Sequence, residues 1–144
     1  MRFLNGLQPL GLLVLRIALA LIFVYHGYPK LVHPTDMIRQ FFVQHGLPGY
    51  FMSVAGILEC FGGLLLAVGL FTRPAALLLS CEMVIAIWKV HSTHGIMAVK
   101  EYEFPLSLCV ACFALATLGP GALSLDTLIF GSASKKRALR NSKA

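Results

Sequence analysis

The sequence contains few charged residues, and acidic residues are the scarcest of them. Asp, Glu, Lys and Arg make up 12% of the 144 residues, and only 6 residues are acidic. A soluble domain carries roughly 25% charged residues, so this composition argues against a soluble protein. The sequence also lacks a Rossmann fingerprint, a P-loop and a hydrolase nucleophile elbow, which argues against the enzyme classes that depend on those motifs.

Hydrophobic residues take the place of charged ones. They account for 58% of the chain, and the mean hydropathy is +0.79. An apolar run of about 18 residues is long enough to cross a hydrocarbon core of about 30 Å. The first apolar run is too long for the core of a signal peptide and continues without a small-residue cleavage site. We therefore predict a multi-pass membrane protein.

The apolar runs predict four crossings and one shorter helix. The spans are expected at about residues 10–31, 50–71, 74–90 and 103–119. Asp36–Gln44 is amphipathic and too short to span, with Thr35 or Asp36 to cap its start and Gly46 to end it. The expected fold is an all-α integral membrane four-helix bundle over residues 1–130, with a short interfacial helix between its first and second helices.

The last part of the chain, residues 131–144, is basic. Five of the 12 basic residues lie in the last ten positions, namely Lys135, Lys136, Arg137, Arg140 and Lys143. Basic flanks stay on the cytoplasmic side of a membrane, so we predict a disordered cytoplasmic tail and both termini inside the cell. Because the cluster adjoins a membrane helix, we do not expect it to bind nucleic acid.

The second span carries an acidic residue, Glu59, near its middle. An acid is costly in lipid, so it is expected to face other helices and to mark a specific centre. Gly56, Glu59, Gly63 and Ala67 recur at helical spacing and predict a face of small residues around the acid. The turn at Thr72-Arg73-Pro74 is so short that the second and third spans should be antiparallel neighbours.

Three more ionisable residues lie within the expected spans. Arg16 is in the first span, and Glu82 and Lys89 are in the third. With Glu59 they predict a buried polar core, in which Arg16 pairs with Glu59 or Glu82, and Lys89 meets Glu59 or Glu103. Two interpretations remain open: a structural clamp that fixes the helix register, or a proton or substrate site.

Several motifs resemble those of a known family when their order and spacing are considered together. They are Leu15-Arg16-Ile17, His26-Gly27-Tyr28-Pro29-Lys30-Leu31, Gly46-Leu47-Pro48, Glu59 followed by Gly62-Gly63-Leu64-Leu65-Leu66, Gly69-Leu70-Phe71-Thr72-Arg73-Pro74-Ala75-Ala76, Glu103-Phe104-Pro105-Leu106 and Gly119-Pro120-Gly121-Ala122-Leu123-Ser124-Leu125-Asp126. Over about residues 10–127 the chain resembles the DoxX family of small four-helix bacterial inner-membrane proteins. The resemblance implies a place in the bacterial plasma membrane. Some relatives are linked to quinone-coupled sulfur or thiol oxidation and to oxidative-stress complexes.

The candidate catalytic residues are His26, Glu59 and Glu103. All three can lie on inward faces in the outer half of the bundle, where water supplies protons. Quinone chemistry couples electrons to protons, so it suits an apolar slot with proton-exchanging groups at its mouth. The chain shows no flavin, haem or iron–sulfur pattern, so we expect a redox partner protein to supply the electrons.

Cys109 and Cys112 form a CxxC motif and are candidate redox thiols. A CxxC in a helical bundle resembles that of quinone-linked thiol oxidoreductases. At about 100° per residue, Cys112 lies about 180° from Glu103 on the helix, so it would face lipid if Glu103 faced the bundle. A redox thiol needs access to water and a lowered pKa, so we expect these residues to pack rather than react.

His91 and His94 are three residues apart, and with His26 and Glu103 at the same outer level they could form a metal site. No tight ligand pattern supports such a site. We therefore expect no metal. The leading functional hypothesis is an accessory subunit of a membrane redox system that handles a quinone within the lipid bilayer. The alternatives are a non-enzymatic anchor or scaffold, and a small-solute or proton pathway.

Overall fold

The structure is a computed structural model, and it describes residues 2–91 and 99–130. These residues form helices and turns without a β-strand, which confirms the predicted all-α class. A helical segment at residues 125–130 follows the last long helix. In chain order the elements are α1 (Arg2–Val32), α2 (Asp36–Gln44), α3 (Phe51–Val68), α4 (Thr72–Ala86), the π-helical turn η1 (Ile87–His91) and α5 (Val99–Leu118).

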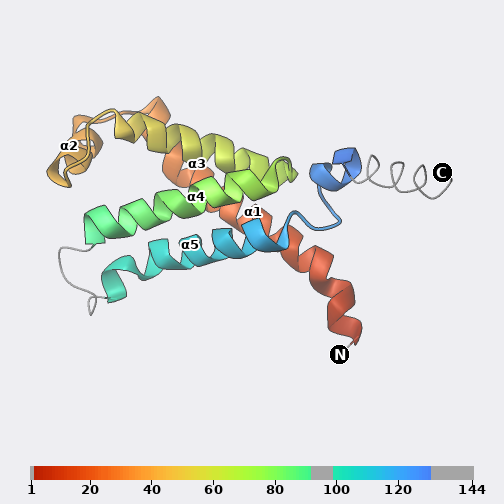
Figure 1. Cartoon of the computed structure of the whole chain (residues 1–144). Helices are drawn as coiled ribbons and strands as arrows, with labels where there is room; N and C mark the ends of the chain where they lie inside the picture. The colour runs from red at the N-terminus through yellow and green to blue at the C-terminus, as the bar shows by residue number, and fades with distance from the viewer. Residues whose placement is uncertain (1, 92–98, 131–144) are drawn as a thin grey trace, which may run out of the picture.

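The four longer helices pack together (Figure 1). Helices α3, α4 and α5 lie side by side, and α1 crosses them obliquely. Helix α1 packs mainly along α3, and α4 packs mainly along α5. The start of α1 and residues 125–130 lie at one end of the bundle, whereas α2 lies at the other end. The predicted contact between the antiparallel second and third spans is confirmed by α3 and α4.

One apolar core joins these four helices. Leu19 and Phe23 come from α1, Leu66 from α3, Leu79 from α4 and Leu115 from α5, and all five are buried. Helices in lipid associate through close packing, because lipid tails are as apolar as the side chains themselves. The core therefore depends on shape complementarity between helices.

The outer surface of the bundle is also apolar. Among the described residues, Gly6–Val32 and Phe51–Val68 are long and apolar enough to cross a membrane, and Tyr102–Leu118 is a shorter apolar helix. Large side chains on these helices are exposed, including Leu21 and Phe61. Continuous exposed apolar surface suits contact with lipid, so the fold is that of a helical membrane bundle. The four crossings remain a prediction.

Helix ends differ from the predicted spans by a few residues. Helix α1 begins at Arg2 rather than near residue 10 and contains Pro9, which helices in membranes tolerate. Helix α3 ends at Val68 because Gly69 adopts a left-handed φ of 70° and donates its N–H to the Leu65 carbonyl. Helix α5 begins at Val99, four residues before the predicted position.

The short helix α2 spans the predicted residues, and Thr35 caps it. The Thr35 hydroxyl accepts a hydrogen bond from the Ile38 N–H, and Gly46 follows with a φ of 72°. No residue of α2 is buried, and its apolar Met37 is largely exposed. Such a helix suits the membrane surface. The predicted basic tail, residues 131–144, lies outside the described residues.

Candidate functional site

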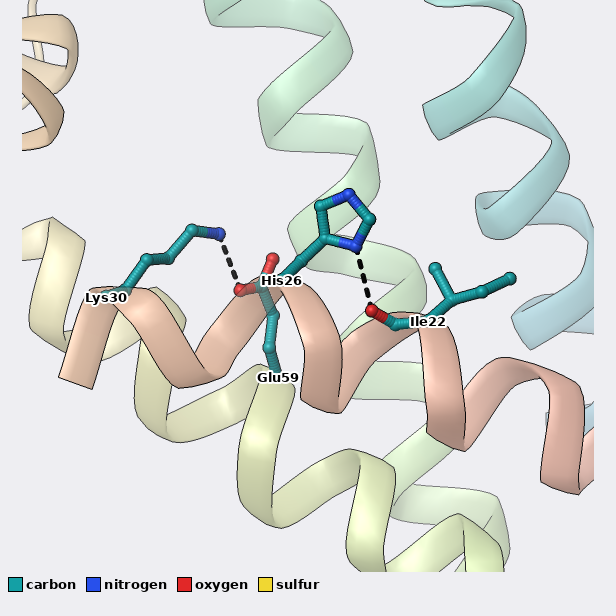
Figure 2. A network of polar contacts seen from close by, with 4 residues as sticks. All are labelled: Ile22, His26, Lys30 and Glu59. Carbon is teal, nitrogen blue, oxygen red and sulfur yellow. Dashed lines mark hydrogen bonds and ion pairs between the residues drawn. The ribbon is translucent and has the colours of Figure 1, made fainter. Parts of the chain in front are cut away.

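Glu59 forms an ion pair with Lys30. The Lys30 amine on α1 lies 2.5 Å from Oε2 of Glu59 on α3, and the two side chains are 20% and 6% exposed. Figure 2 shows the Glu59 carboxylate between the Lys30 amine and the His26 ring. Both of these α1 residues interact electrostatically with Glu59. The predicted inward position of Glu59 is therefore correct, but its partner is neither Arg16 nor Lys89.

Gly27 brings α1 and α3 close enough to form this pair. A Cβ at position 27 would lie 2.8 Å from the Glu59 Cβ and 2.9 Å from the backbone nitrogen of Cys60. Gly56 and Gly63 are buried on the same face of α3 as Glu59, which confirms the predicted face of small residues. Small residues let helix backbones approach closely in a membrane.

His26 lies one helical turn before Lys30. Its Nδ1 is 2.8 Å from the Ile22 carbonyl oxygen (Figure 2). Because a carbonyl oxygen only accepts hydrogen bonds, Nδ1 is the donor, and Nε2 is left to accept or transfer a proton. The ring also packs against Phe104 of α5, with ring centroids 5.7 Å apart. His26 is thus held by two neighbours and still exposed.

An apolar groove runs beside His26 along α1. It has a volume of about 960 Å³ and is bordered by side chains of α1, α3 and α5. Its opening faces the lipid-exposed surface, because Leu21, Tyr25 and Leu64 in its wall are themselves exposed. A long apolar groove with one histidine at its edge fits a lipid-soluble molecule with a polar head group.

Glu103 does not belong to this site. It lies on the exposed face of α5, so the prediction that it points into the bundle was wrong. The next residue, Phe104, occupies the place beside His26 instead. The structure therefore brings His26 and Glu59 together and leaves Glu103 outside.

Cys112 explains why Glu103 points outward. It is completely buried in the core, and the two residues lie on opposite sides of α5, as the helical spacing predicts. The prediction that Cys112 faces lipid was wrong because the inward side of α5 was assigned to the wrong residue. Cys109 is partly buried, and its sulfur lies 3.4 Å from the Ser80 hydroxyl. Both cysteines are free thiols at the interface of α4 and α5.

Arg16 has a different environment from the one predicted. It is 1% exposed, and its guanidinium donates to the Leu123 carbonyl oxygen after α5. It forms no ion pair with Glu59 or Glu82, so the predicted pairing was wrong. Arg16 has this partner because residues 123–126, which follow α5, fold back over the turn between α3 and α4 and place a backbone carbonyl beside its guanidinium. Asp126 in this segment also interacts electrostatically with Arg16.

Asp126 fixes the returning segment to the turn. Its two carboxylate oxygens accept hydrogen bonds from the N–H groups of Phe71 and Thr72, at 2.8 and 2.9 Å. These N–H groups are at the start of α4, where a negative charge is favourable. The Asp126 N–H donates to the Gly69 carbonyl. These hydrogen bonds hold the segment against one end of the bundle.

Glu82 lies on α4 and Lys89 on the adjoining turn η1, and the two side chains have different neighbours. Glu82 interacts electrostatically with Glu59 and Lys30. Lys89 lies over the Trp88 ring, 5.1 Å from its centroid, so the predicted contact of Lys89 with Glu59 or Glu103 was wrong. A charged amine gains more from an aromatic face at the membrane boundary than from the bilayer interior. Glu59 is thus grouped with Lys30 and Glu82, whereas Arg16 is buried separately at the other end of the bundle.

The described residues contain no group of three His, Cys, Asp or Glu side chains that could hold a metal ion. His94 lies outside the described residues, and the side chain of His91 is not described either.

The chain matches a known family model. Residues 11–92 match the model of the DoxX family. The chain belongs to the DoxX family. This stretch contains Arg16, His26, Lys30, Glu59 and Glu82, so these five ionisable residues all lie in the matched part of this DoxX protein.

Curated relatives extend the similarity over most of the chain. The chain is 33% identical to "Putative oxidoreductase CatD" of Bacillus subtilis (strain 168), covering 88% of this chain and 92% of the relative. It is 30% identical to "Inner membrane protein YqjF" of Escherichia coli (strain K12), covering 85% and 95%. An "Uncharacterized protein" of Haemophilus influenzae is 39% identical, covering 90% and 98%. No solved structure matches significantly. The DoxX protein described here is therefore a membrane protein.

Lys30 is the member of the ion pair that sequence reasoning missed. From the sequence alone, a lysine that follows Tyr28 and Pro29 near the end of the first span is expected at the membrane interface. The missed signal is its spacing: Lys30 lies four residues after His26, so both occupy one face of α1. Gly27 beside them allows α3 to approach that region closely.

Proposed function

We propose that this DoxX protein is an accessory subunit of a bacterial inner-membrane redox system and holds a quinone in the groove beside His26. The observation that carries the proposal is an apolar, lipid-facing groove lined by His26, which also interacts with Glu59 of the Lys30–Glu59 pair. The printed name of one relative includes the word oxidoreductase, which supports the same class.

The apolar wall of the groove would take the ring and tail of the quinone, and His26 would stand at the head group. The Nδ1 hydrogen bond to Ile22 fixes the imidazole ring and leaves Nε2 to exchange a proton with a quinone oxygen. His26 interacts electrostatically with Glu59, which is paired with Lys30. The electrons come from a partner protein, so the isolated protein is expected to show no turnover.

The test is extraction of bound quinone after purification in mild detergent. We expect the wild-type protein to retain quinone, and His26→Ala and Phe104→Ala to retain several-fold less. Phe113→Ala is the matched control, because Phe113 is an exposed α5 residue outside the groove. Equal retention by all four proteins, or none by the wild type, would contradict the proposal.

A cellular test separates a redox role from an anchor. A strain that lacks the protein is expected to be sensitive to thiol oxidants, and His26→Ala should reproduce that sensitivity. If the deletion strain is sensitive but His26→Ala cells match the wild type, the anchor or scaffold interpretation replaces this one.

We also propose four crossings with both termini in the cytoplasm. The start of α1 and residues 125–130 lie at one end of the bundle and α2 at the other (Figure 1), which supports an even number of crossings. In intact cells, a membrane-impermeant maleimide should label His45→Cys but not Ser134→Cys. The parental protein, with its own cysteines, is the control, and the reverse labelling pattern would overturn the orientation.

A further inference from the structure

Glu82 on α4 is a partly buried acid that the proposed function does not use. Its Oε2 atom is buried and receives no hydrogen bond from the described part of the chain. An ionised carboxylate oxygen inside an apolar bundle needs a donor or a cation, because without one its charge is strongly unfavourable. The chemistry of Glu82 therefore depends on the groups around it.

Among the described residues, the charged neighbours of Glu82 are one acid and one lysine, and α3 and α4 are in close contact here, since a Cβ at Gly62 would lie 3.1 Å from the Leu79 side chain. Glu59 from α3 and Lys30 from α1 both interact electrostatically with Glu82. From α5, Cys112 also interacts with Glu82, and Cys112 lies next to Cys109. His26 acts on Glu59. The lysine is already bonded to Glu59 at 2.5 Å, so its charge balances one carboxylate and leaves the other without a partner.

Two nearby carboxylates in a low-dielectric site do not both stay ionised when only one cation is present. The ion pair assigns the charge to Glu59, because Lys30 donates directly to its Oε2. We infer that Glu82 is a proton-binding site: it holds an exchangeable proton at neutral pH beside the charged Lys30–Glu59 pair. This inference rests on the ion pair and the buried Oε2 atom and does not depend on quinone binding.

In this arrangement the protonation of Glu82 and the pairing of Lys30 depend on each other. When Glu82 loses its proton to water or to another base, it becomes a second carboxylate that competes with Glu59 for Lys30. Proton release from Glu82 is therefore coupled to the pairing of Lys30, and a proton taken up by Glu59 would release Lys30 to Glu82. Transfer of the proton from Glu82 to Glu59 keeps the net charge of the three residues at zero, whereas loss of the proton to water leaves a net charge of −1.

Carbodiimide labelling tests the proton on the wild-type protein without any substitution. Dicyclohexylcarbodiimide reacts with protonated carboxyl groups in apolar surroundings, and mass spectrometry locates the modified residue. In the full-length protein in detergent at neutral pH, we expect modification at Glu82 and little at Glu59. Modification of Glu59 with none at Glu82, or of neither residue, would overturn the inference.

Infrared spectroscopy provides the second measurement, through the carbonyl stretch of protonated carboxyl groups. The chain has only 6 acidic residues, so one buried protonated carboxyl makes a resolvable contribution. We expect the band to disappear in Glu82→Gln and to persist in Glu103→Gln, the matched control on the exposed face of α5. An unchanged band in folded Glu82→Gln would overturn the inference.

Two further variants distinguish a protonated Glu82 from one that binds a small cation. In Lys30→Met, Glu59 loses its partner, so we expect the band to double as both acids become protonated. In Glu59→Gln, Lys30 becomes available to Glu82, so we expect the band to disappear. A site in which Glu82 is ionised and binds a cation would show no band in the wild-type protein, and that result would also overturn the inference. Quinone retention in these variants is scored separately, so the two proposals fail independently.

Discussion

Arg16, which is buried, and Lys30, which is partly buried, are stabilised in different ways at the two ends of the bundle. Arg16 donates to a backbone carbonyl in a segment that folds back after α5, and the turn around it is closed by Asp126 and Gly69. Lys30 pairs with a carboxylate of the neighbouring helix and lies near an open apolar groove and an exposed histidine. At the first end Arg16 and Asp126 both form hydrogen bonds to backbone groups, whereas at the second end several titratable side chains lie close to one another.

This difference assigns a structural role to the Arg16 end of α1 and a functional role to the Lys30 end. A guanidinium stays charged at any physiological pH, and a backbone carbonyl cannot titrate, so the Arg16 end is suited to holding the chain together. A lysine, two glutamates and a histidine form a set in which protons can move. The motifs that resemble the DoxX family include both Arg16 and Lys30, but the groups around these two residues differ in their chemistry.

The largest loss of stability is expected at the Arg16 end, from Gly69→Ala. A Cβ there would lie in the place of the Arg16 guanidinium, and Gly69 has a φ of 70°. The left-handed conformation costs about 1–2 kcal/mol for alanine, and loss of the charged hydrogen bond costs about 1.5–3 kcal/mol. Thermal unfolding in detergent measures the effect.

Gly6→Ala is the control for Gly69→Ala, because a Cβ at position 6 meets nothing within 4 Å. We expect its melting temperature to stay at the wild-type value. Equal melting temperatures for the two variants would show that the turn between α3 and α4 does not hold Arg16.

The next largest effect is expected from breaking the ion pair. Glu59→Leu leaves Lys30 buried without a partner, at a cost of about 3 kcal/mol, and should be tolerated worse than Cys112→Ala. Removing both partners in Lys30→Met/Glu59→Leu should recover most of the stability, because no unpaired charge remains. If Glu59→Leu melts at the wild-type temperature, the pair makes no contribution to stability.

Gly27→Ala tests the close approach of α1 and α3 more gently. The added Cβ would lie 2.8 Å from the Glu59 Cβ, so the helices must shift, at a cost of about 1–3 kcal/mol. We also expect less bound quinone, because the shift moves His26 relative to Phe104. Gly11→Ala on the same helix is the control, since its Cβ would meet nothing within 4 Å; matching losses in both variants would show that α1 tolerates no added methyl group anywhere.

The smallest effect is expected from Glu103→Gln. Its side chain lies on an exposed face of α5, so the free energy of unfolding should change by less than about 0.5 kcal/mol. A loss as large as that of Glu59→Leu would return Glu103 to the buried site and contradict the assignment of the faces of α5.

Patterns within single helices could be predicted well from the sequence. Small residues at helical spacing correctly placed Glu59 inside the bundle, and the amphipathic pattern with Thr35 correctly predicted α2. Periodicity also gave the correct relation between Cys112 and Glu103, as opposite sides of α5. It could not determine which side faces inward, because both faces of a helix in lipid are apolar.

Partners between distant parts of the chain were not predictable. Arg16 pairs with Leu123, 107 residues away, through a backbone carbonyl that leaves no signal in the sequence. The Lys30–Glu59 pair requires the close approach of helices that Gly27 permits, and Lys30 was assigned to the interface because that position is the commoner one for a lysine near a helix end. In this bundle the lysine turns inward to the acid.

Photochemical cross-linking with an azido-substituted quinone is the most direct test of the claim that the ligand binds at the Lys30–Glu59 end of the bundle. Mass spectrometry of the purified protein would locate the adducts. We predict adducts on groove residues beside His26, such as Tyr25 and Phe104, and competition by unlabelled quinone. Adducts confined to the Arg16 end, for instance on Phe71 or Pro120, or labelling that unlabelled quinone does not reduce, would contradict the assignment of the ligand site to the Lys30–Glu59 end.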